Sequence, residues 1–165
     1  LVSMSIVNSF FKENLINKGV DRYNSRPISV ANYSPYKYFN NVLYISGQLP
    51  MVNGKLKYYG KIGKDINEND SEDCILICTS NILWNVCYFL ENTKQKVAHV
   101  GCLNLKGYFN AVNSYEEHPK LLDKASKLIV EVLGPELGRH SRLAVGCASL
   151  PKNSPVEIEA TFSIL

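Results

Sequence analysis

The sequence lacks long apolar runs, paired cysteine motifs and a strong charge of either sign. Its longest uninterrupted apolar runs are about five residues, far short of the roughly 18 that a membrane-spanning helix needs. Its five cysteines include no CxxC pair, and no histidine accompanies them at zinc-ligand spacing. We therefore expect no membrane partner, no metal site and no disulfide scaffold, and we interpret the cysteines as reduced, mostly buried thiols.

Charge is also sparse. The chain has 18 basic and 15 acidic residues, a net charge of +3, and only four of the basic residues are arginines. A dedicated nucleic-acid-binding domain usually carries a denser basic stripe, so this balance neither requires nor excludes an anionic partner. The N-terminus shows no secretory pattern. We expect a cytoplasmic protein, with an organellar leader removed from the chain as the alternative.

What the sequence does have is the size and composition of one globular domain. Its 165 residues are 45% hydrophobic and 20% charged, which suits a single core and is too apolar for disorder. We expect residues 28–165 to form this domain and residues 1–27 to supply an N-terminal helix and an extended lead-in. The helix is predicted over residues 5–19, because apolar residues recur at helical spacing before a glycine.

Strand patterns open and close the predicted domain. Residues 28–38 are predicted to be extended and residues 42–46 to form a strand, while Asn53-Gly54 between apolar residues indicates a hairpin. Two alternating runs, 142–149 and 156–164, predict the last two strands. The chain therefore begins with a β-meander and ends with a second group of strands.

Two helices and one further strand are predicted between these groups. The first helix runs to about Glu91 from a cap at Asp70 or Ser71, and it is apolar on most of its circumference, which implies burial on more than one side. The second begins near Pro119 and ends at Gly134-Pro135, and residues 96–112 between the helices are predicted to form a strand. This order favours an α+β fold, with a mixed β-sheet and helices on one face.

The last two strands carry the residues best suited to chemistry. Alternation places Arg142, Ala144, Gly146 and Ala148 on one face, which is small apart from one guanidinium. Such a face lets another layer or a ligand approach closely, and the planar guanidinium can hold a carboxylate through two hydrogen bonds. In the following strand, Glu157 lies on the face opposite the predicted core.

These residues are not expected to meet within one chain. A plain hairpin between the last two strands would place Glu157 opposite about residue 148, roughly 20 Å from Arg142. Our hypothesis is that the small-residue face packs against a neighbouring subunit, so that Arg142 and Glu157 from different chains line one cleft. The alternative interpretation is an interface salt bridge for Arg142 and a solvated face for the glutamates.

Several motifs together resemble the Rid (YjgF, L-PSP endoribonuclease) superfamily. Residues 138–151 (GRHSRLAVGCASLP) and 155–160 (PVEIEA) resemble its C-terminal signature. Residues 32–35 (NYSP), 43–50 (LYISGQLP) and 60–63 (GKIG) resemble earlier family motifs in the same order, so the similarity covers residues 28–164.

The resemblance implies a chorismate-mutase-like fold, a homotrimeric barrel assembly and ligand clefts between subunits, with an added N-terminal helix in this chain. It implies that Arg142 binds the carboxylate of a 2-imino or 2-enamino acid and that Glu157 orients the hydrolytic water. Gly47 and Ala144 would complete the pocket, together with Tyr33 or Tyr36. The implied reaction is hydrolysis to a 2-keto acid and ammonia, without a metal or organic cofactor.

Two other functions stay open. Some members of the superfamily are described as endoribonucleases that inhibit translation, which makes RNA an alternative partner. The third hypothesis is a trimer that binds small carboxylates without turnover. Two departures from the archetypal deaminases favour this hypothesis. Their cysteine two residues after the arginine is Ala144 here, and the asparagine of their second helix is replaced near Ala125.

Overall fold

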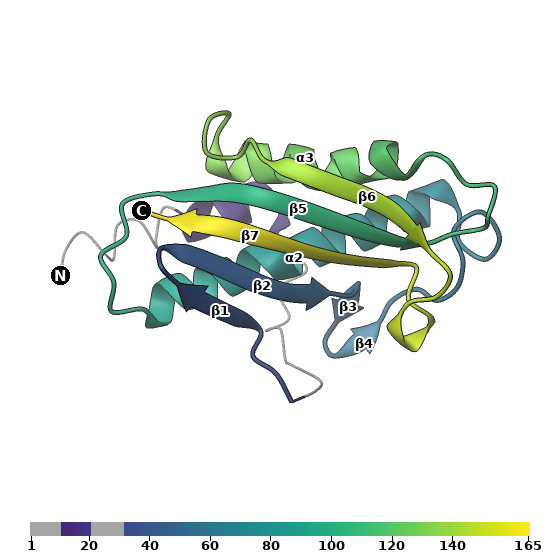
Figure 1. Ribbon diagram of the computed structural model, residues 1–165, viewed down its shortest axis with the longest axis horizontal. Coiled ribbons are helices and arrows are strands. Elements are labelled where there is room, and N and C mark those ends of the chain that lie inside the picture. The colour runs from purple at the N-terminus through teal and green to yellow at the C-terminus, as the bar shows by residue number, and fades with distance from the viewer. Residues whose placement is uncertain (1–10, 21–31) are drawn as a thin grey trace.

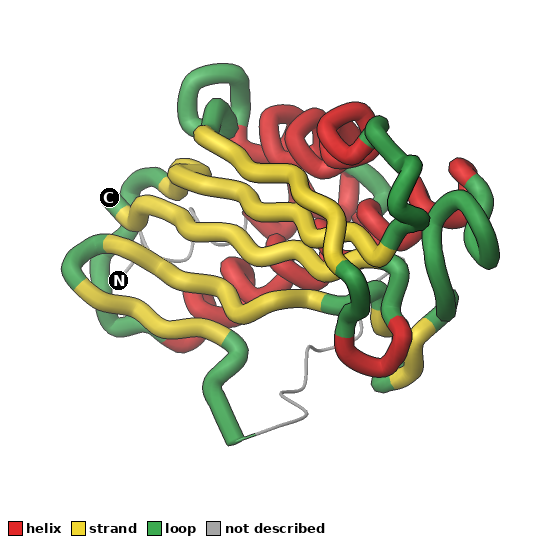
Figure 2. Tube along the Cα trace, turned by 45° about the vertical axis from the view of Figure 1, so that its right-hand side comes forward, coloured by secondary structure: helices red, strands yellow, loops and turns green. Residues whose placement is uncertain are grey.

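The computed structural model describes residues 11–20 and 32–165, which form a β-sheet with helices on one face (Figure 1). A view turned by 45° separates the two layers clearly (Figure 2). The elements are β1 (Tyr36–Phe39), β2 (Val42–Gln48), β3 (Met51–Val52), β4 (Lys55–Leu56), α2 (Glu68–Asn92), β5 (Val100–Asn110), α3 (His118–Leu133), β6 (Ser141–Cys147) and β7 (Val156–Ile164). The predicted α+β class with a mixed sheet is confirmed.

The five-stranded sheet has the order β1-β2-β7-β5-β6, and only β5 and β6 pair in parallel. A parallel pair needs a crossover connection, which α3 supplies. A plain hairpin between β6 and β7 is therefore not formed, because β5 lies between them. The Asn53-Gly54 hairpin is confirmed, with both residues at positive φ, but β3 and β4 form a separate small sheet.

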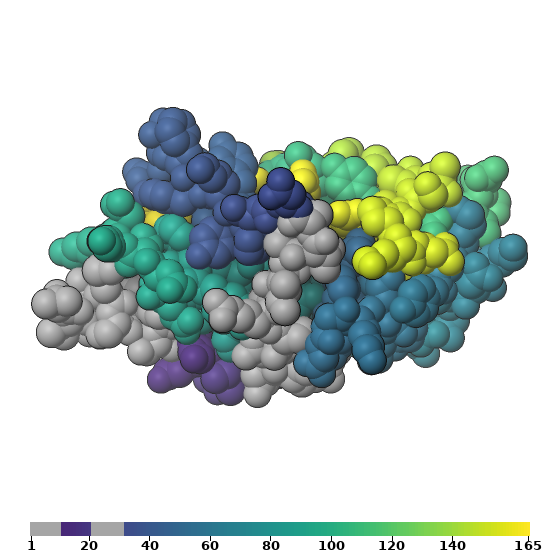
Figure 3. Space-filling view, turned by 90° about the horizontal axis from the view of Figure 1, so that it is seen from below, coloured from purple at the N-terminus to yellow at the C-terminus, as the bar shows by residue number. Residues whose placement is uncertain are grey.

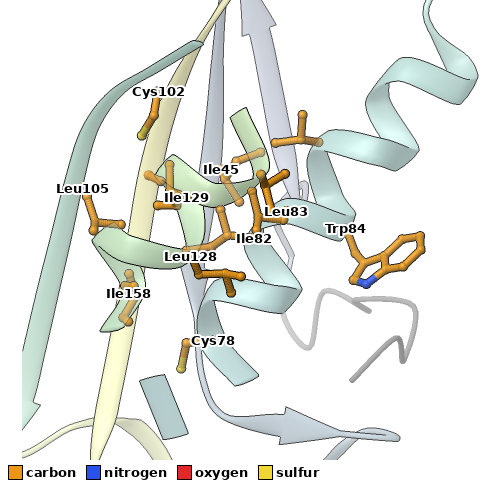
Figure 4. Packing of buried hydrophobic residues seen from close by; sticks show 14 of the residues in the cluster. Ile45, Cys78, Ile82, Leu83, Trp84, Cys102, Leu105, Leu128, Ile129 and Ile158 are labelled. Carbon is orange, nitrogen blue, oxygen red and sulfur yellow. The ribbon is translucent and has the colours of Figure 1, made fainter. Parts of the chain in front are cut away.

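The long helix α2 is the centre of the core. It begins a turn earlier than predicted, because the side chain of Asn67, and not that of Asp70 or Ser71, caps it by accepting a hydrogen bond from the Asp70 amide at 2.8 Å. Burial on more than one side is confirmed: buried residues surround much of the helix. Ile82 and Leu83 of this helix belong to the same buried cluster as Leu128 of α3 and the sheet residue Ile158 (Figure 4).

By length and composition alone, α2 could cross a membrane, since its mean hydropathy is 1.4 over 18 residues. However, 83% of that stretch is buried within the protein. The sheet and α3 pack against it, and the indole nitrogen of Trp84 donates to the carbonyl of Val20 at 3.3 Å. Its apolar character is accounted for by its place in the core.

The N-terminal segment adds a short helix to the helical side of the sheet. Residues 11–17 are helical, and Phe11, Leu15 and Val20 are buried in the main core. The surface of this segment is purple in Figure 3. The beginning of the helix predicted over residues 5–19 and the first part of the extended segment predicted over 28–38 lie outside the described residues. The full extent of that helix stays a prediction.

Helix α3 follows its prediction closely. Pro119 stands in its first turn, Gly134 ends it at a φ of 91°, and its buried stripe includes Leu121, Ala125 and Leu128. A glycine suits this end because positive φ strains residues that carry a Cβ. The stripe faces β5 and β6, so the exposed face of α3 borders the edge strand of the sheet.

Leu105→Ala should reduce the free energy of unfolding by about 2–5 kcal/mol, because it opens a cavity in a site with no solvent exposure. Urea unfolding followed by circular dichroism measures this change. The matched control is Leu165→Ala, which removes the same atoms from an exposed side chain and should change stability by about 0.5 kcal/mol or less. Equal losses for both variants would contradict the assigned core.

Candidate functional site

Arg142 lies on the edge strand β6 and points toward α3. Its Nη1 forms an ion pair with Oδ1 of Asp123 at 2.8 Å and donates to Oγ of Ser126 at 3.1 Å, while Nη2 donates to the carbonyl of Pro119 at 3.3 Å. The side chains of Arg142 and Asp123 remain 30% and 65% exposed. The guanidinium is thus held by internal partners, yet solvent reaches both members of the ion pair.

The predicted role of the small-residue face needs correction. Arg142, Ala144 and Gly146 do share a face, but that face meets α3 of the same chain, and Leu143 on the opposite face is exposed. A Cβ added at Gly146 would come within 2.8 Å of Nε2 of His118, at the start of α3. At Gly146, the missing side chain leaves room for the ring of His118. Ala148 lies beyond the end of β6.

Glu157 lies on the outer face of the sheet, away from the core, as predicted, whereas Arg142 lies on the helical face. Burial, with a smaller contribution from Glu159, raises the pKa of its carboxyl group above the ordinary value. Among the described residues, this carboxylate has no hydrogen-bond or ion-pair partner, whereas the neighbouring Glu159 pairs with Lys106 at 2.8 Å. Glu157 is therefore a half-buried carboxylate available to a group outside this part of the chain.

Gly47 lies directly beneath Glu157. The register between β2 and β7 shifts between Ile45 and Gln48, and a Cβ added at Gly47 would overlap Oε1 of Glu157. Only a residue without a side chain leaves room for the carboxylate in this position. The motif glycine and the glutamate therefore form one local unit, although they lie 110 residues apart in the sequence.

The two predicted tyrosines lie in different places. The ring of Tyr36 packs edge-on against Phe89 of α2, with centroids 5.9 Å apart, on the helical side of the sheet and away from Glu157. Tyr33 is half exposed in the loop before β1. The next residue, Ser34, accepts a hydrogen bond from Oγ of Ser46 at 2.8 Å, which holds this loop beside Gly47. The loop of Tyr33, and not Tyr36, borders the Gly47 and Glu157 unit.

Arg142 and Glu157 do not meet within the chain, as predicted, although the reason differs. Arg142 pairs in register with Leu105 and Glu157 with Tyr108, and β5 separates their strands. Three residues along the strands and two strand spacings across them place the two Cα atoms about 14 Å apart, with side chains on opposite faces. The two groups are therefore separate within one protomer.

Three polar residues beside Arg142 were missed by the sequence analysis: Asp123, Ser126 and His140. Oγ of Ser126 lies 2.9 Å from Nε2 of His140, and Nδ1 of that ring lies 2.6 Å from the carbonyl of Gly138. The spacing of Asp123 and Ser126 places them on one helix face, which is a weak signal. Only the packing of α3 against β6 shows that this face meets Arg142.

The described residues include no cluster suited to a metal ion, and most of their thiols are buried. Over residues 11–20 and 32–165, no cluster of three or more His, Cys, Asp or Glu residues could hold a metal ion. Four of the five cysteines are buried, and burial raises the pKa of Cys74, Cys87 and Cys102 to about 12. A thiol with so high a pKa is a poor nucleophile at neutral pH.

The fold and motifs define a chorismate-mutase-like α+β domain. The family model described as "YjgF/chorismate_mutase-like, putative endoribonuclease" matches residues 13–161. The chain belongs to this family, as the resemblance indicated.

The chain is also similar to individual proteins. Protein TCP17 of Trypanosoma cruzi is 31% identical over 134 residues, which cover 81% of this chain and 82% of that protein. Protein Atu1372 of Agrobacterium tumefaciens, of unknown function, is 35% identical with a TM-score of 0.82, over 99% of this chain and 98% of that one. Escherichia coli TdcF with bound serine shares the fold at 17% identity and a TM-score of 0.58, over 84% and 92% of the two chains.

Glu157→Gln should stabilise the protein at neutral pH. Burial raises the folded-state pKa of Glu157 above its unfolded-state value, so ionisation opposes folding. This penalty is absent below the unfolded-state pKa, develops as the pH rises between the two pKa values, and is complete above the folded-state pKa. Urea unfolding at about pH 3.5 and about pH 7 should show a larger gain for the variant at the higher pH.

The control for this prediction is Glu159→Gln, on the same strand and face. That variant loses the ion pair with Lys106 and should gain no stability between the two pH values. A gain of the same size in both variants would show that the burial of Glu157 is not the cause.

Proposed function

We propose that this protein hydrolyses small 2-imino or 2-enamino acids to 2-keto acids and ammonia. The observation that carries the proposal is the solvent-accessible guanidinium of Arg142, on the edge strand of a family member. Its present partner is the exposed carboxylate of Asp123, which a ligand carboxylate can replace. The serine bound to TdcF, a protein of the same fold, is itself a small 2-amino acid with a carboxylate.

The active cleft in this proposal lies between copies of the chain. Arg142 and Glu157 occupy opposite faces of one protomer, so a site that needs both must take them from different protomers. The outer face of the sheet also exposes Tyr44, Leu103 and Leu143, each 44–50% accessible, and such an apolar face favours coverage by a second copy. We infer a closed homotrimer with one cleft at each subunit contact.

The protein needs only to hold the substrate and activate water, because an imine carbon is already electrophilic. Arg142 holds the carboxylate, and Glu157 of the adjacent protomer accepts a proton from the attacking water. The water oxygen bonds to C2, the C=N electron pair moves to nitrogen, and nitrogen takes up a proton. Further proton transfer breaks the C–N bond and releases ammonia and the 2-keto acid. The raised pKa of Glu157 makes its carboxylate a stronger base than that of an ordinary glutamate, which suits a group that must accept and return protons.

Arg142→Ala should abolish accelerated ammonia release from 2-iminobutyrate generated in the assay by an amino-acid oxidase. The rate should fall to that of the reaction without protein, because the carboxylate loses its binding group. The control is Arg139→Ala, which removes an exposed arginine three residues earlier and should retain the wild-type rate. If wild-type protein gives no acceleration but binds pyruvate through Arg142, the function is carboxylate binding without turnover.

Subunit sharing can be tested by mixing two inactive variants. Arg142→Ala and Glu157→Gln each destroy every cleft in a pure trimer, but a mixed trimer contains clefts in which both groups are intact. Each cleft takes Arg142 from one protomer and Glu157 from its neighbour, so about a quarter of the clefts hold both intact groups after random reassembly of equal amounts. The mixture should therefore show about a quarter of the wild-type rate. A mixture as inactive as its parents, with exchange verified by mass spectrometry, would show that the two residues do not share a cleft.

The family description also keeps an endoribonuclease function as the alternative. In the described part of the chain, six lysines already pair with carboxylates: Lys12, Lys57, Lys106, Lys120, Lys124 and Lys127. Contacts to a phosphate backbone require basic groups that are free to exchange counterions. Salt-dependent binding of single-stranded RNA by the homogeneous protein would favour this alternative over the deaminase.

A further inference from the structure

Ser126 and His140 form a directed hydrogen-bond chain beside Arg142. The carbonyl of Gly138 can only accept, so the ring nitrogen Nδ1 of His140, 2.6 Å away, carries a proton. In the neutral ring, Nε2 is then the acceptor, and the hydroxyl of Ser126 at 2.9 Å donates to it. Oγ of Ser126 in turn accepts from Nη1 of Arg142 at 3.1 Å. With a neutral ring, the chain therefore runs from the guanidinium through the hydroxyl to the imidazole.

The backbone holds this arrangement tightly. A Cβ added at Gly138 would lie 2.6 Å from both the carbonyl oxygen of Gly134 and the Cα of Val130, so the turn after α3 packs directly on the end of that helix. The amide of Gly138 also donates to the carbonyl of Gly134 at 2.8 Å. His140 is thereby positioned over the helix face that carries Ser126, and the pair is pre-organised before any ligand binds.

We propose that Ser126, backed by His140, binds the α-substituent of the acid whose carboxylate is held by Arg142, and passes a proton between His140 and that substituent. This inference rests on the proposed function and adds to it Ser126, from outside the recognised motifs, and His140, which lies within the C-terminal motif but has no role implied by the resemblance. Ser126 would contact the ligand, and His140 would act through Ser126 as a positioning residue and proton reservoir.

The geometry places an α-substituent at Ser126. Oδ1 of Asp123 and Oγ of Ser126 both bind Nη1 of Arg142, at 2.8 and 3.1 Å. A ligand carboxylate oxygen that replaces Asp123 on this nitrogen therefore lies beside the Ser126 hydroxyl. In a 2-keto or 2-imino acid, the heteroatom on C2 is the next polar atom of the ligand and comes within reach of the hydroxyl. The site thus selects acids with a polar group on C2 over plain carboxylates.

Protonation of His140 determines whether the Ser126 hydroxyl donates a hydrogen bond to the ligand or accepts one from it. With neutral His140, the hydroxyl proton points to the ring, and Ser126 can accept from an N–H group of the ligand. With protonated His140, Nε2–H donates to Ser126, and the hydroxyl proton turns to an acceptor on C2. The charged groups joined to the pair are Arg142 from β6 and Asp123 from α3. During imine hydrolysis this route supplies the proton that nitrogen takes up when water adds to C2.

The test compares two acids that differ only at C2, pyruvate and propionate, by isothermal titration calorimetry. Ser126→Ala should weaken pyruvate binding at least about fivefold, the loss of one hydrogen bond, and leave propionate binding within about twofold. Ser126→Thr keeps the hydroxyl and should restore the preference. The control Ser114→Ala removes an exposed hydroxyl from the loop before α3 and should change neither affinity.

Nitrogen NMR of the histidine side chains gives a second readout. Pyruvate should convert Nε2 of His140 from an acceptor to a protonated donor in the wild-type protein and in Ser126→Thr, but not in Ser126→Ala. Propionate should leave the ring unchanged, and the exposed His99 is the internal control. Equal effects of Ser126→Ala on both acids, or an unchanged His140 signal with pyruvate, would overturn the inference.

The same data separate this inference from the proposed function. If Arg142→Ala abolishes binding of both acids while Ser126→Ala does not discriminate between them, the carboxylate site stands and the role of Ser126 is wrong. If wild-type protein binds neither acid, the proposed function itself fails, and the inference fails with it.

Discussion

The parallel pairing of β5 and β6 is the constraint on which the candidate site depends. Parallel neighbours cannot be joined by a tight turn, so the chain must cross over the sheet, and α3 is that crossover. Gly146 leaves room for the ring of His118, at the start of this helix. The same close approach brings Asp123 and Ser126 to the guanidinium of Arg142. The parallel strand pairing therefore determines both the position of α3 and the polar cluster around Arg142.

A second close approach organises the other face of the sheet. The bulge in β2 brings the backbone at Gly47 under β7, and the absent side chain leaves space for the carboxylate of Glu157. This carboxylate is partly desolvated and without a partner among the described residues, which is unfavourable in a purely structural role. The protomer therefore presents two separate polar groups on opposite faces. In the function that we propose, copies of the chain bring these groups together.

The two half-sites differ in how much of them could be predicted. Glu157 and Gly47 belong to recognisable motifs, and strand alternation correctly placed the glutamate on the outer face. Alternation also grouped Arg142 with Ala144 and Gly146, but it could not say which face turns toward the core. His140 is isolated in the sequence, so its contact with Ser126 could not be predicted. Both the orientation and the contact depend on how α3 lies over β6.

The sequence by itself determined the elements, the α+β class, the mixed sheet and the family, because these follow from local periodicity, turn residues and motif order. Asn53-Gly54, Gly134 and the alternation of β7 are local signals, and they hold whatever surrounds them. Only the tertiary structure decided that β5 separates β6 from β7 and that Arg142 meets Asp123, Ser126 and, through Ser126, His140. Strand order and helix placement result from burying the whole chain at once, and local residue patterns carry little information about them.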